Sequence, residues 1–327
     1  MDLKQYRIFI ATYPFAETGK KPLSILQECG AELVFNPFNR RLKTGEVNDL
    51  IKDVDAVIAG TEPYNEETLK NCERLKLISR VGIGLDSVDL AYCRDNNIGV
   101  AYTPDAPSDG VAELAVGNML NLVRHIHESD RSVREGAWNR LMGYLIREVK
   151  IGVIGVGRIG SRVINLLQTF QPNILAYDTD ENVRKTQYPN TTWTDLETIL
   201  KESDIITLHI PLNEKNHHFI NREKIARMKT GAMLINTARG PIVDETALYD
   251  ALVQKHLGGA AVDVFAKEPY DGPLVKLDNV VLTAHIAASA NLSRYLMELG
   301  AAENSIAVLS GNVPSYDAIK DTFGAQS

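Results

Sequence analysis

Short apolar runs alternate with longer polar stretches along the first hundred residues. The runs are rich in Ile, Val, Leu and Ala and have the length of a strand, whereas the stretches between them have the spacing of amphipathic helices. Such alternation is typical of βαβ units around a parallel sheet. The predicted strands lie at 8–11, 32–35, 56–59, 77–79 and 99–101.

The same alternation begins again at Val149. Apolar runs of strand length are again separated by helical stretches, which predicts a second doubly wound sheet. We therefore expect an α/β protein with two doubly wound parallel-sheet domains. The six predicted strands of the second series lie at 151–154, 174–177, 205–208, 233–235, 259–262 and 280–282.

Two longer patterns with helical spacing lie outside these series. One covers 111–125 and is expected to connect the two domains, and the other covers 288–309. Pro104 and Pro107 end the first βαβ series, because proline disfavours the continuation of a regular element. A domain boundary is expected near these prolines.

Composition and charge narrow the functional classes. A length of 327 residues suits about two domains. The hydrophobic share of 44% and the charged share of 24% are those of a globular chain. The net charge is −7 and no long run of Lys or Arg is present, so nucleic acid is not an expected partner.

The cysteines and the N-terminus indicate the compartment. Cys29, Cys72 and Cys93 lack CxxC spacing, which predicts reduced thiols and neither a disulfide framework nor a metal site. The apolar run near the N-terminus is too short for a signal-peptide core or a spanning helix. We expect a cytoplasmic protein with no membrane partner.

A glycine-rich loop follows the first strand of the second series. Gly155, Gly157 and Gly160 form a Gly-x-Gly-x-x-Gly pattern after an apolar strand and before a helix that begins at Arg158 and Ile159. The first glycine permits a tight turn, the second lets a pyrophosphate approach the backbone, and the third lets the helix pack on the strand. The free N–H groups of the helix then face the phosphates. The loop predicts a dinucleotide site.

Asp178 indicates which dinucleotide the loop binds. It follows the strand at 174–177, at the distance past the loop where an acidic residue holds the adenosine ribose hydroxyls. A ribose 2′-phosphate would be repelled there, which favours NAD over NADP. Because about 150 residues precede the loop, the first series is expected to form a separate domain, and a cleft between two domains is a natural substrate site.

Four polar residues follow later strands of the second series. Arg239, Asp263, Glu268 and His285 come after strands whose carboxyl ends meet at one edge of a sheet. Reduction of a 2-oxo acid needs a cation for the carboxylate and carbonyl and a proton donor for the developing alkoxide. Arg239 and His285 suit these roles, and Glu268 would keep His285 protonated and oriented.

These segments together resemble the D-isomer-specific 2-hydroxyacid dehydrogenases, and most of all their phosphoglycerate dehydrogenase branch. The resemblance covers nearly the whole chain. It implies that Arg239, Glu268 and His285 are the catalytic residues, and that a flavodoxin-like substrate-binding domain of 1–103 plus 297–327 holds an inserted Rossmann NAD-binding domain of 104–296. The matching segments are 80–89, 155–160, 236–240, 268–269 and 285–286.

The resemblance also implies binding roles for other residues. The N–H groups of Ile83 and Gly84 would bind the substrate carboxylate, and Asp263 would hold the nicotinamide carboxamide. The remaining residues that would face the cofactor are His209, Pro211, Thr237 and Ala238.

A phosphorylated substrate would need further cations. Arg80 and Arg140 are the candidates, and Arg140 would come from the neighbouring subunit of a homodimer formed through the cofactor domain. Against this, the segment Gly60-Thr61-Glu62-Pro63 stands where phosphoglycerate dehydrogenases usually offer an Arg, and Glu62 has the wrong charge for a phosphate. The chain ends at Ser327, so a C-terminal domain for serine feedback is not expected.

Because the resemblance is strongest to the phosphoglycerate dehydrogenase branch, the first substrate to test is 3-phosphoglycerate. Two alternatives stay open. One is a glyoxylate or hydroxypyruvate reductase, and the other is a non-enzymatic NAD sensor, since corepressors of the carboxy-terminal-binding-protein type share the fold and the three residues.

Overall fold

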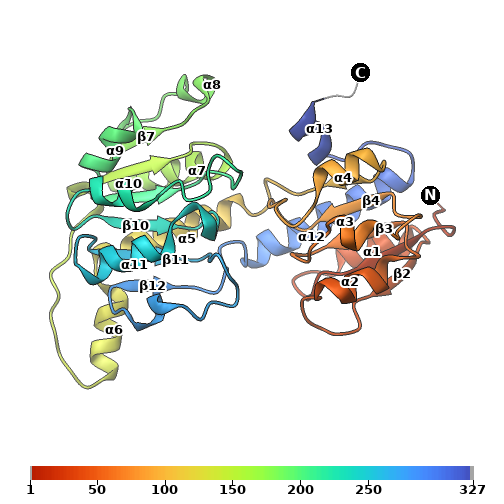
Figure 1. Ribbon diagram of the computed structural model, residues 1–327, viewed down its shortest axis with the longest axis horizontal. Helices are drawn as coiled ribbons and strands as arrows, with labels where there is room; N and C mark the ends of the chain where they lie inside the picture. The colour runs from red at the N-terminus through yellow and green to blue at the C-terminus, as the bar shows by residue number, and fades with distance from the viewer. Residues whose placement is uncertain (1, 325–327) are drawn as a thin grey trace. The chain divides into compact units, whose positions relative to one another are not determined.

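The computed structural model describes residues 2–324. The chain divides into two compact units, one formed by Met1–Pro107 with Ala288–Ser327 and the other by Ser108–Ala287. Each unit has its own sheet flanked by helices (Figure 1). No helix within residues 2–324 is both long enough and apolar enough to cross a membrane.

The first unit is built on a five-stranded parallel sheet. Its strand order, β2-β1-β3-β4-β5, is that of a flavodoxin-like fold, as the sequence predicts. The strands are β1 (Arg7–Ile10), β2 (Glu32–Phe35), β3 (Ala56–Ala59), β4 (Leu77–Arg80) and β5 (Gly99–Ala101). The helices are α1 (Lys21–Glu28), α2 (Thr44–Ile51), α3 (Glu66–Leu69), α4 (Leu90–Asp95), α12 (Asn291–Leu309) and α13 (Ala318–Phe323).

Both faces of this sheet are buried, which explains why its central strands read as apolar runs. Successive residues of a strand point to opposite faces. Phe9 accordingly belongs to one core cluster, whereas Ile8 and Ile10 belong to another. Met297 and Ala301 of α12 belong to that second cluster, so α12 covers one face of the sheet. The domain boundary placed at residue 297 lies within this helix.

The second unit is built on a seven-stranded parallel sheet of order β12-β11-β10-β9-β6-β7-β8. The strands are β6 (Lys150–Ile154), β7 (Asn173–Tyr177), β8 (Thr191–Trp193), β9 (Ile205–Leu208), β10 (Met233–Asn236), β11 (Gly259–Val262) and β12 (Val280–Leu282). The helices are α5 (Ser108–Val123), α6 (Ile126–Arg134), α7 (Arg158–Leu167), α8 (Glu181–Arg184), α9 (Leu196–Glu202), α10 (Arg222–Arg227) and α11 (Glu245–Val253). Short 3-10 helices lie at η1 (Ile146–Glu148), η2 (Gln168–Phe170), η3 (Gly240–Ile242) and η4 (Pro273–Lys276).

The structure corrects two expectations for this unit. β8 was not predicted, because this edge strand is short and carries two threonines instead of an apolar run. The helix predicted over 111–125 ends at Val123 as α5, since His125 has a left-handed backbone with φ of 53° and separates α5 from α6. α5 belongs wholly to the second unit.

Candidate functional site

The glycine loop lies between β6 and α7. Gly155 has φ of +87°, and a Cβ there would come within 2.6 Å of the His209 carbonyl oxygen. A Cβ on Gly160 would come within 2.0 Å of the Gly155 carbonyl oxygen. A Cβ on Gly157, in contrast, would meet nothing within 4 Å. Gly155 and Gly160 are therefore needed for internal packing, and Gly157 leaves its backbone accessible.

The start of α7 offers backbone N–H groups. The helix begins at Arg158, and Gly157 at its N-cap makes no side-chain capping bond. The first N–H groups of a helix have no partner within the helix and carry the positive end of its dipole. This end therefore suits a bound phosphate group.

Asp178 lies next to the glycine loop, directly after β7. Its Oδ2 accepts a hydrogen bond of 2.7 Å from the Val156 N–H, and its Oδ1 accepts one of 2.9 Å from the Asp180 N–H. The sheet places β7 beside β6, so the carboxylate and the loop come from neighbouring strand ends. This is the arrangement that the spacing in the sequence predicts.

His209 follows β9, on the other side of β6. Its N–H donates to the Ile154 carbonyl oxygen at 2.8 Å, and its Nε2 lies 3.0 Å from the Thr207 Oγ1. Burial lowers the pKa of His209 to about 3, so the ring is neutral near pH 7. Its Nδ1 is buried and has no hydrogen-bond partner among the described residues. The exposed Pro211 follows two residues later.

Thr237 and Ala238 follow β10, which pairs with β9. Thr237 is 5% exposed, and its buried Oγ1 has no hydrogen-bond partner within residues 2–324. The Ala238 N–H donates to the Asn236 Oδ1 at 3.1 Å. Buried polar groups are normally hydrogen-bonded, so this Oγ1 is left for a ligand or a water molecule to satisfy.

His285 and Glu268 are in direct contact. The His285 Nδ1 lies 3.0 Å from the Glu268 Oε2 and 3.2 Å from its Oε1. Glu268 is itself fixed, because its Oε1 accepts a hydrogen bond of 3.1 Å from the Phe265 N–H. The side chains of His285 and Glu268 are 40% and 31% exposed. The carboxylate contacts Nδ1 and leaves Nε2 outside this contact.

The backbone at His285 has an unusual conformation, with φ of 53°. Such a conformation is uncommon for a non-glycine residue and persists only where the surroundings hold it. Asp263 provides this support. Its buried carboxylate accepts from the Thr283 Oγ1 at 2.6 Å, the Ile286 N–H at 2.8 Å and the Ala287 N–H at 3.0 Å. Asp263 thus holds the segment that carries His285, a role that the sequence does not reveal.

Arg239 lies in the loop after β10. Its Nη1 donates to the Ala238 carbonyl oxygen at 2.7 Å. The next residue, Gly240, packs directly on the loop after β11, since a Cβ there would lie 2.0 Å from the Phe265 carbonyl carbon. The segments that carry Arg239, Glu268 and His285 follow β10, β11 and β12, which are neighbours in the sheet.

In the first unit, Ile83 and Gly84 follow β4. Gly82 has φ of +141°, and its N–H is bound to the Thr103 Oγ1 at 2.9 Å. The N–H groups of Ile83 and Gly84 donate no hydrogen bond to another described residue. Both N–H groups are therefore left for a ligand that accepts hydrogen bonds.

Arg80 does not extend toward solvent. It is 5% exposed, and its guanidinium donates to backbone carbonyl oxygens. Nε binds the Gly84 oxygen at 3.0 Å, and Nη1 binds the Ala59 oxygen at 3.3 Å and also the Gly60 oxygen. Arg140, in contrast, is exposed in the segment between α6 and η1.

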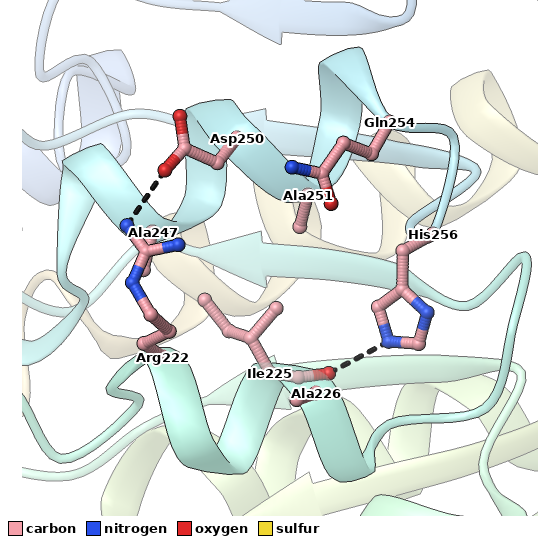
Figure 2. A pocket seen from close by; sticks show the side chains of 8 residues that line it. All are labelled: Arg222, Ile225, Ala226, Ala247, Asp250, Ala251, Gln254 and His256. Atoms are coloured by element: carbon pink, nitrogen blue, oxygen red, sulfur yellow. Dashed lines mark hydrogen bonds and ion pairs between the residues drawn. The ribbon is translucent and has the colours of Figure 1, made fainter.

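A pocket of about 260 Å³ lies on the second unit between α10 and α11 (Figure 2). Arg222 and Asp250, which form an ion pair of 2.6 Å, lie on the opposite side of it from His256, whose Nε2 contacts the Ile225 carbonyl oxygen at 2.9 Å. None of the predicted site residues lines this pocket. It is therefore separate from the site at the strand ends.

Known proteins provide a comparison for this geometry. Residues 116–287 match the family described as D-isomer specific 2-hydroxyacid dehydrogenase, NAD binding domain. A glyoxylate reductase of Thermofilum pendens is 39% identical over 302 residues, which are 89% of this chain and 89% of the relative. A hydroxypyruvate reductase of Thermotoga maritima is 40% identical over 77% of this chain and 83% of the relative.

A D-3-phosphoglycerate dehydrogenase of Methanocaldococcus jannaschii is 37% identical over 93% of this chain, which spans 58% of that longer protein. Among solved structures, the D-lactate dehydrogenase of Aquifex aeolicus, complexed with NAD and lactic acid, has a TM-score of 0.84 and 28% identity. The match covers 96% of this chain and 99% of that one.

Proposed function

Since this chain belongs to the D-isomer-specific 2-hydroxyacid dehydrogenases, an NAD-dependent family, we propose that it interconverts a small, unphosphorylated 2-oxo acid and the corresponding D-2-hydroxy acid. In this proposal Arg239, Glu268 and His285 are the catalytic residues. The observation that carries it is the contact of the His285 Nδ1 with the Glu268 carboxylate, on the strand-end edge that also carries the glycine loop.

The residues around the glycine loop fit a bound NAD. Gly157 leaves open space over its backbone, the uncapped start of α7 at Arg158 and Ile159 suits the pyrophosphate, and Asp178 suits the ribose hydroxyls. Further contacts to the cofactor are proposed for Gly155, Gly160, His209, Pro211, Thr237, Ala238 and Asp263. When bound, NAD accepts the hydride from the hydroxy acid or donates it to the oxo acid.

His285 is proposed to move the proton that accompanies the hydride. Because Glu268 accepts a hydrogen bond from Nδ1–H, Nε2 is left to protonate the developing alkoxide during reduction or to take the hydroxyl proton during oxidation. The Arg239 guanidinium is proposed to polarise the carbonyl and pair with the carboxylate. The N–H groups of Ile83 and Gly84 supply a carboxylate-binding site in the first unit.

The surroundings of Arg80 support an unphosphorylated substrate. Its guanidinium is buried and bonds to backbone oxygens, instead of pointing outward as a phosphate ligand would. The relatives named glyoxylate reductase and hydroxypyruvate reductase are consistent with this substrate class. 3-Phosphohydroxypyruvate stays the second candidate because the exposed Arg140 can supply a cation and one relative is a D-3-phosphoglycerate dehydrogenase.

We propose a cytoplasmic homodimer that forms through the NAD-binding unit. Trp138 and Met142 are 78% and 90% exposed in the segment that also carries Arg140. Large exposed apolar side chains mark interaction sites. Arg140 would then serve the partner subunit. The buried, unpaired cysteines suit a reducing compartment.

The test is oxidation of NADH in the presence of glyoxylate, hydroxypyruvate or 3-phosphohydroxypyruvate, followed by absorbance. We expect turnover of the first two compounds, and His285→Ala should lose most of it while it still binds NADH. Failure to reduce any of the three would contradict the proposed reaction. Unchanged turnover by His285→Ala would contradict the role of His285.

A further inference from the structure

The loop after β11 carries Glu268, and the position of Glu268 depends on the backbone of this loop. The Phe265 N–H donates to the Glu268 Oε1 at 3.1 Å. The Phe265 ring stacks on the Tyr270 ring, with the ring centroids 4.2 Å apart, and belongs to a core cluster of the second unit. The backbone at Phe265 therefore helps to place the Glu268 carboxylate, which in turn contacts His285.

Glu245 binds this backbone from the neighbouring segment. Its Oε1 accepts a hydrogen bond of 2.6 Å from the N–H of Ala266, the residue directly after Phe265. A carboxylate that accepts from a backbone N–H forms a charge-assisted hydrogen bond, which is stronger than a neutral one. Glu245 is the first residue of α11, which follows the loop that carries Arg239. The hydrogen bond thus joins the segment after β10 to the segment after β11.

Gly240 provides a second contact between the same two segments. A Cβ on Gly240 would overlap the Phe265 carbonyl carbon and the Ala266 nitrogen, so the missing side chain lets the two backbones touch. Packing at Gly240 sets how closely the segments approach. The hydrogen bond to Glu245 sets the orientation of the peptide, because hydrogen bonds are directional. A rotation of this peptide would disturb the adjoining Phe265 N–H, which binds Glu268.

The stability of α11 does not by itself explain this hydrogen bond. An acidic residue in the first turn stabilises a helix through its dipole, but Asp244 already caps α11 by accepting from the Ala247 N–H at 3.0 Å. Glu223 lies in the first turn of α10 and forms an ion pair of 3.4 Å within that helix, with Arg227. The Glu245 carboxylate, in contrast, binds a loop outside its own helix.

We propose that Glu245 is a positioning residue that holds the loop backbone so that Glu268 keeps its contact with His285. The inference rests on the proposed function, since this contact matters for the rate only if His285 moves the proton that accompanies the hydride. A displaced catalytic group lowers the rate even when the substitution lies far from the reacting atoms. Loss of the hydrogen bond to Glu245 should therefore lower kcat and leave KM unchanged.

The experiment compares substitutions of Glu245 with Glu223→Ala, which also removes an acidic residue from the first turn of a helix. Glu245→Ala removes the acceptor. Glu245→Gln keeps an acceptor oxygen at the same reach without the charge, and Glu245→Asp keeps the charge on a shorter side chain. The measured quantities are kcat and KM for hydroxypyruvate, the Kd for NADH and Tm.

We expect kcat to fall about tenfold in Glu245→Ala and in Glu245→Asp. Glu245→Gln and Glu223→Ala should keep kcat near the wild-type value, and KM and the Kd for NADH should be unchanged in every variant. A lower Tm with unchanged kcat in Glu245→Ala would show a purely structural role. Wild-type kcat in Glu245→Asp with low kcat in Glu245→Gln would show that the charge acts and not the hydrogen bond. Either result would overturn the proposal.

A double variant identifies the group through which Glu245 acts. If Glu245 acts by placing Glu268, adding Glu245→Ala to Glu268→Ala should lower kcat no further, because residues that act through one contact are not additive. A further fall of the same size, or a raised KM in place of a lowered kcat, would overturn the proposal. If Glu245→Ala does not fold, the comparison of Glu245→Gln with Glu245→Asp decides. If the wild-type enzyme reduces none of the oxo acids, the proposed function itself fails.

Discussion

Two glycines of the cofactor loop should respond differently to the same substitution. In Gly160→Ala the new methyl would lie 2.0 Å from the Gly155 carbonyl oxygen, whereas non-bonded carbon atoms prefer about 3.5–4.0 Å. The helix or the loop must therefore move. Overpacking costs about 1–3 kcal/mol, and contact with backbone atoms places this site toward the upper end. Alanine regains up to about 1 kcal/mol through helix propensity.

The net loss for Gly160→Ala is then about 1–2 kcal/mol, which lowers Tm by roughly 2–8 °C for a domain of this size. NADH affinity should fall as well, because the loop moves with the helix. In Gly157→Ala the methyl meets nothing within 4 Å, so Tm should be unchanged. The new methyl group would, however, lie where the pyrophosphate approaches the backbone. We therefore expect the Kd for NADH to rise at least about tenfold.

Thermal unfolding without cofactor and fluorescence titration with NADH separate the two effects. Gly157→Ala serves as the control for stability, since it introduces the same methyl into the same loop. A wild-type Tm for Gly160→Ala would refute the packing argument. Wild-type NADH affinity for Gly157→Ala would refute the argument that the cofactor lies against this backbone.

Three further predictions concern titratable groups. Glu268→Gln should lower kcat at least about tenfold with little change in NADH affinity, because proton transfer contributes about 10²–10⁴-fold; equal kcat in a steady-state assay would contradict this. His209 has a pKa of 6.5 in the unfolded chain and of about 3 in the folded chain. Between these two values the unfolded chain binds a proton that the folded chain does not bind. The free energy of unfolding therefore decreases as the pH falls from 6.5 toward 3, by at most about 1.4 kcal/mol per pH unit. Urea unfolding at pH 7 and 5 should show a smaller decrease for His209→Gln, and equal decreases would rule the effect out. Burial raises the pKa of Cys72 to about 11 and of Cys93 to about 12, so a thiol reagent at pH 8 should modify both only after unfolding, as mass spectrometry would show.

The sheets could be predicted from the sequence because their strands are buried on both faces. A buried parallel strand is a continuous apolar run, and β3 and β9 are apolar over most of their length. β8 lacks this signal, since an edge strand with threonines has the pattern of a loop. The end of α5 also depends on a left-handed His125, which no apolar spacing indicates.

The site could be anticipated only in part. The rule that ligands lie at the carboxyl ends of parallel strands places the segments of Arg239, Glu268 and His285 together, and the structure brings Glu268 into contact with His285. The contacts of Arg80, in contrast, could not be predicted from the sequence. The orientation of its guanidinium depends on the positions of four backbone carbonyl groups, and the burial of Glu62 depends on the missing side chain at Gly60. Such details arise from tertiary structure alone.

The division of the first unit has a consequence for synthesis on the ribosome. Its five strands emerge early, but α12, which covers the face lined by Ile8 and Ile10, is translated only after the entire second unit. At about 5–20 residues per second, this apolar face waits many seconds for its helix. The nascent chain therefore has a period in which a completed nucleotide-binding unit is attached to an unfinished neighbour, and chaperone binding should be concentrated in that period.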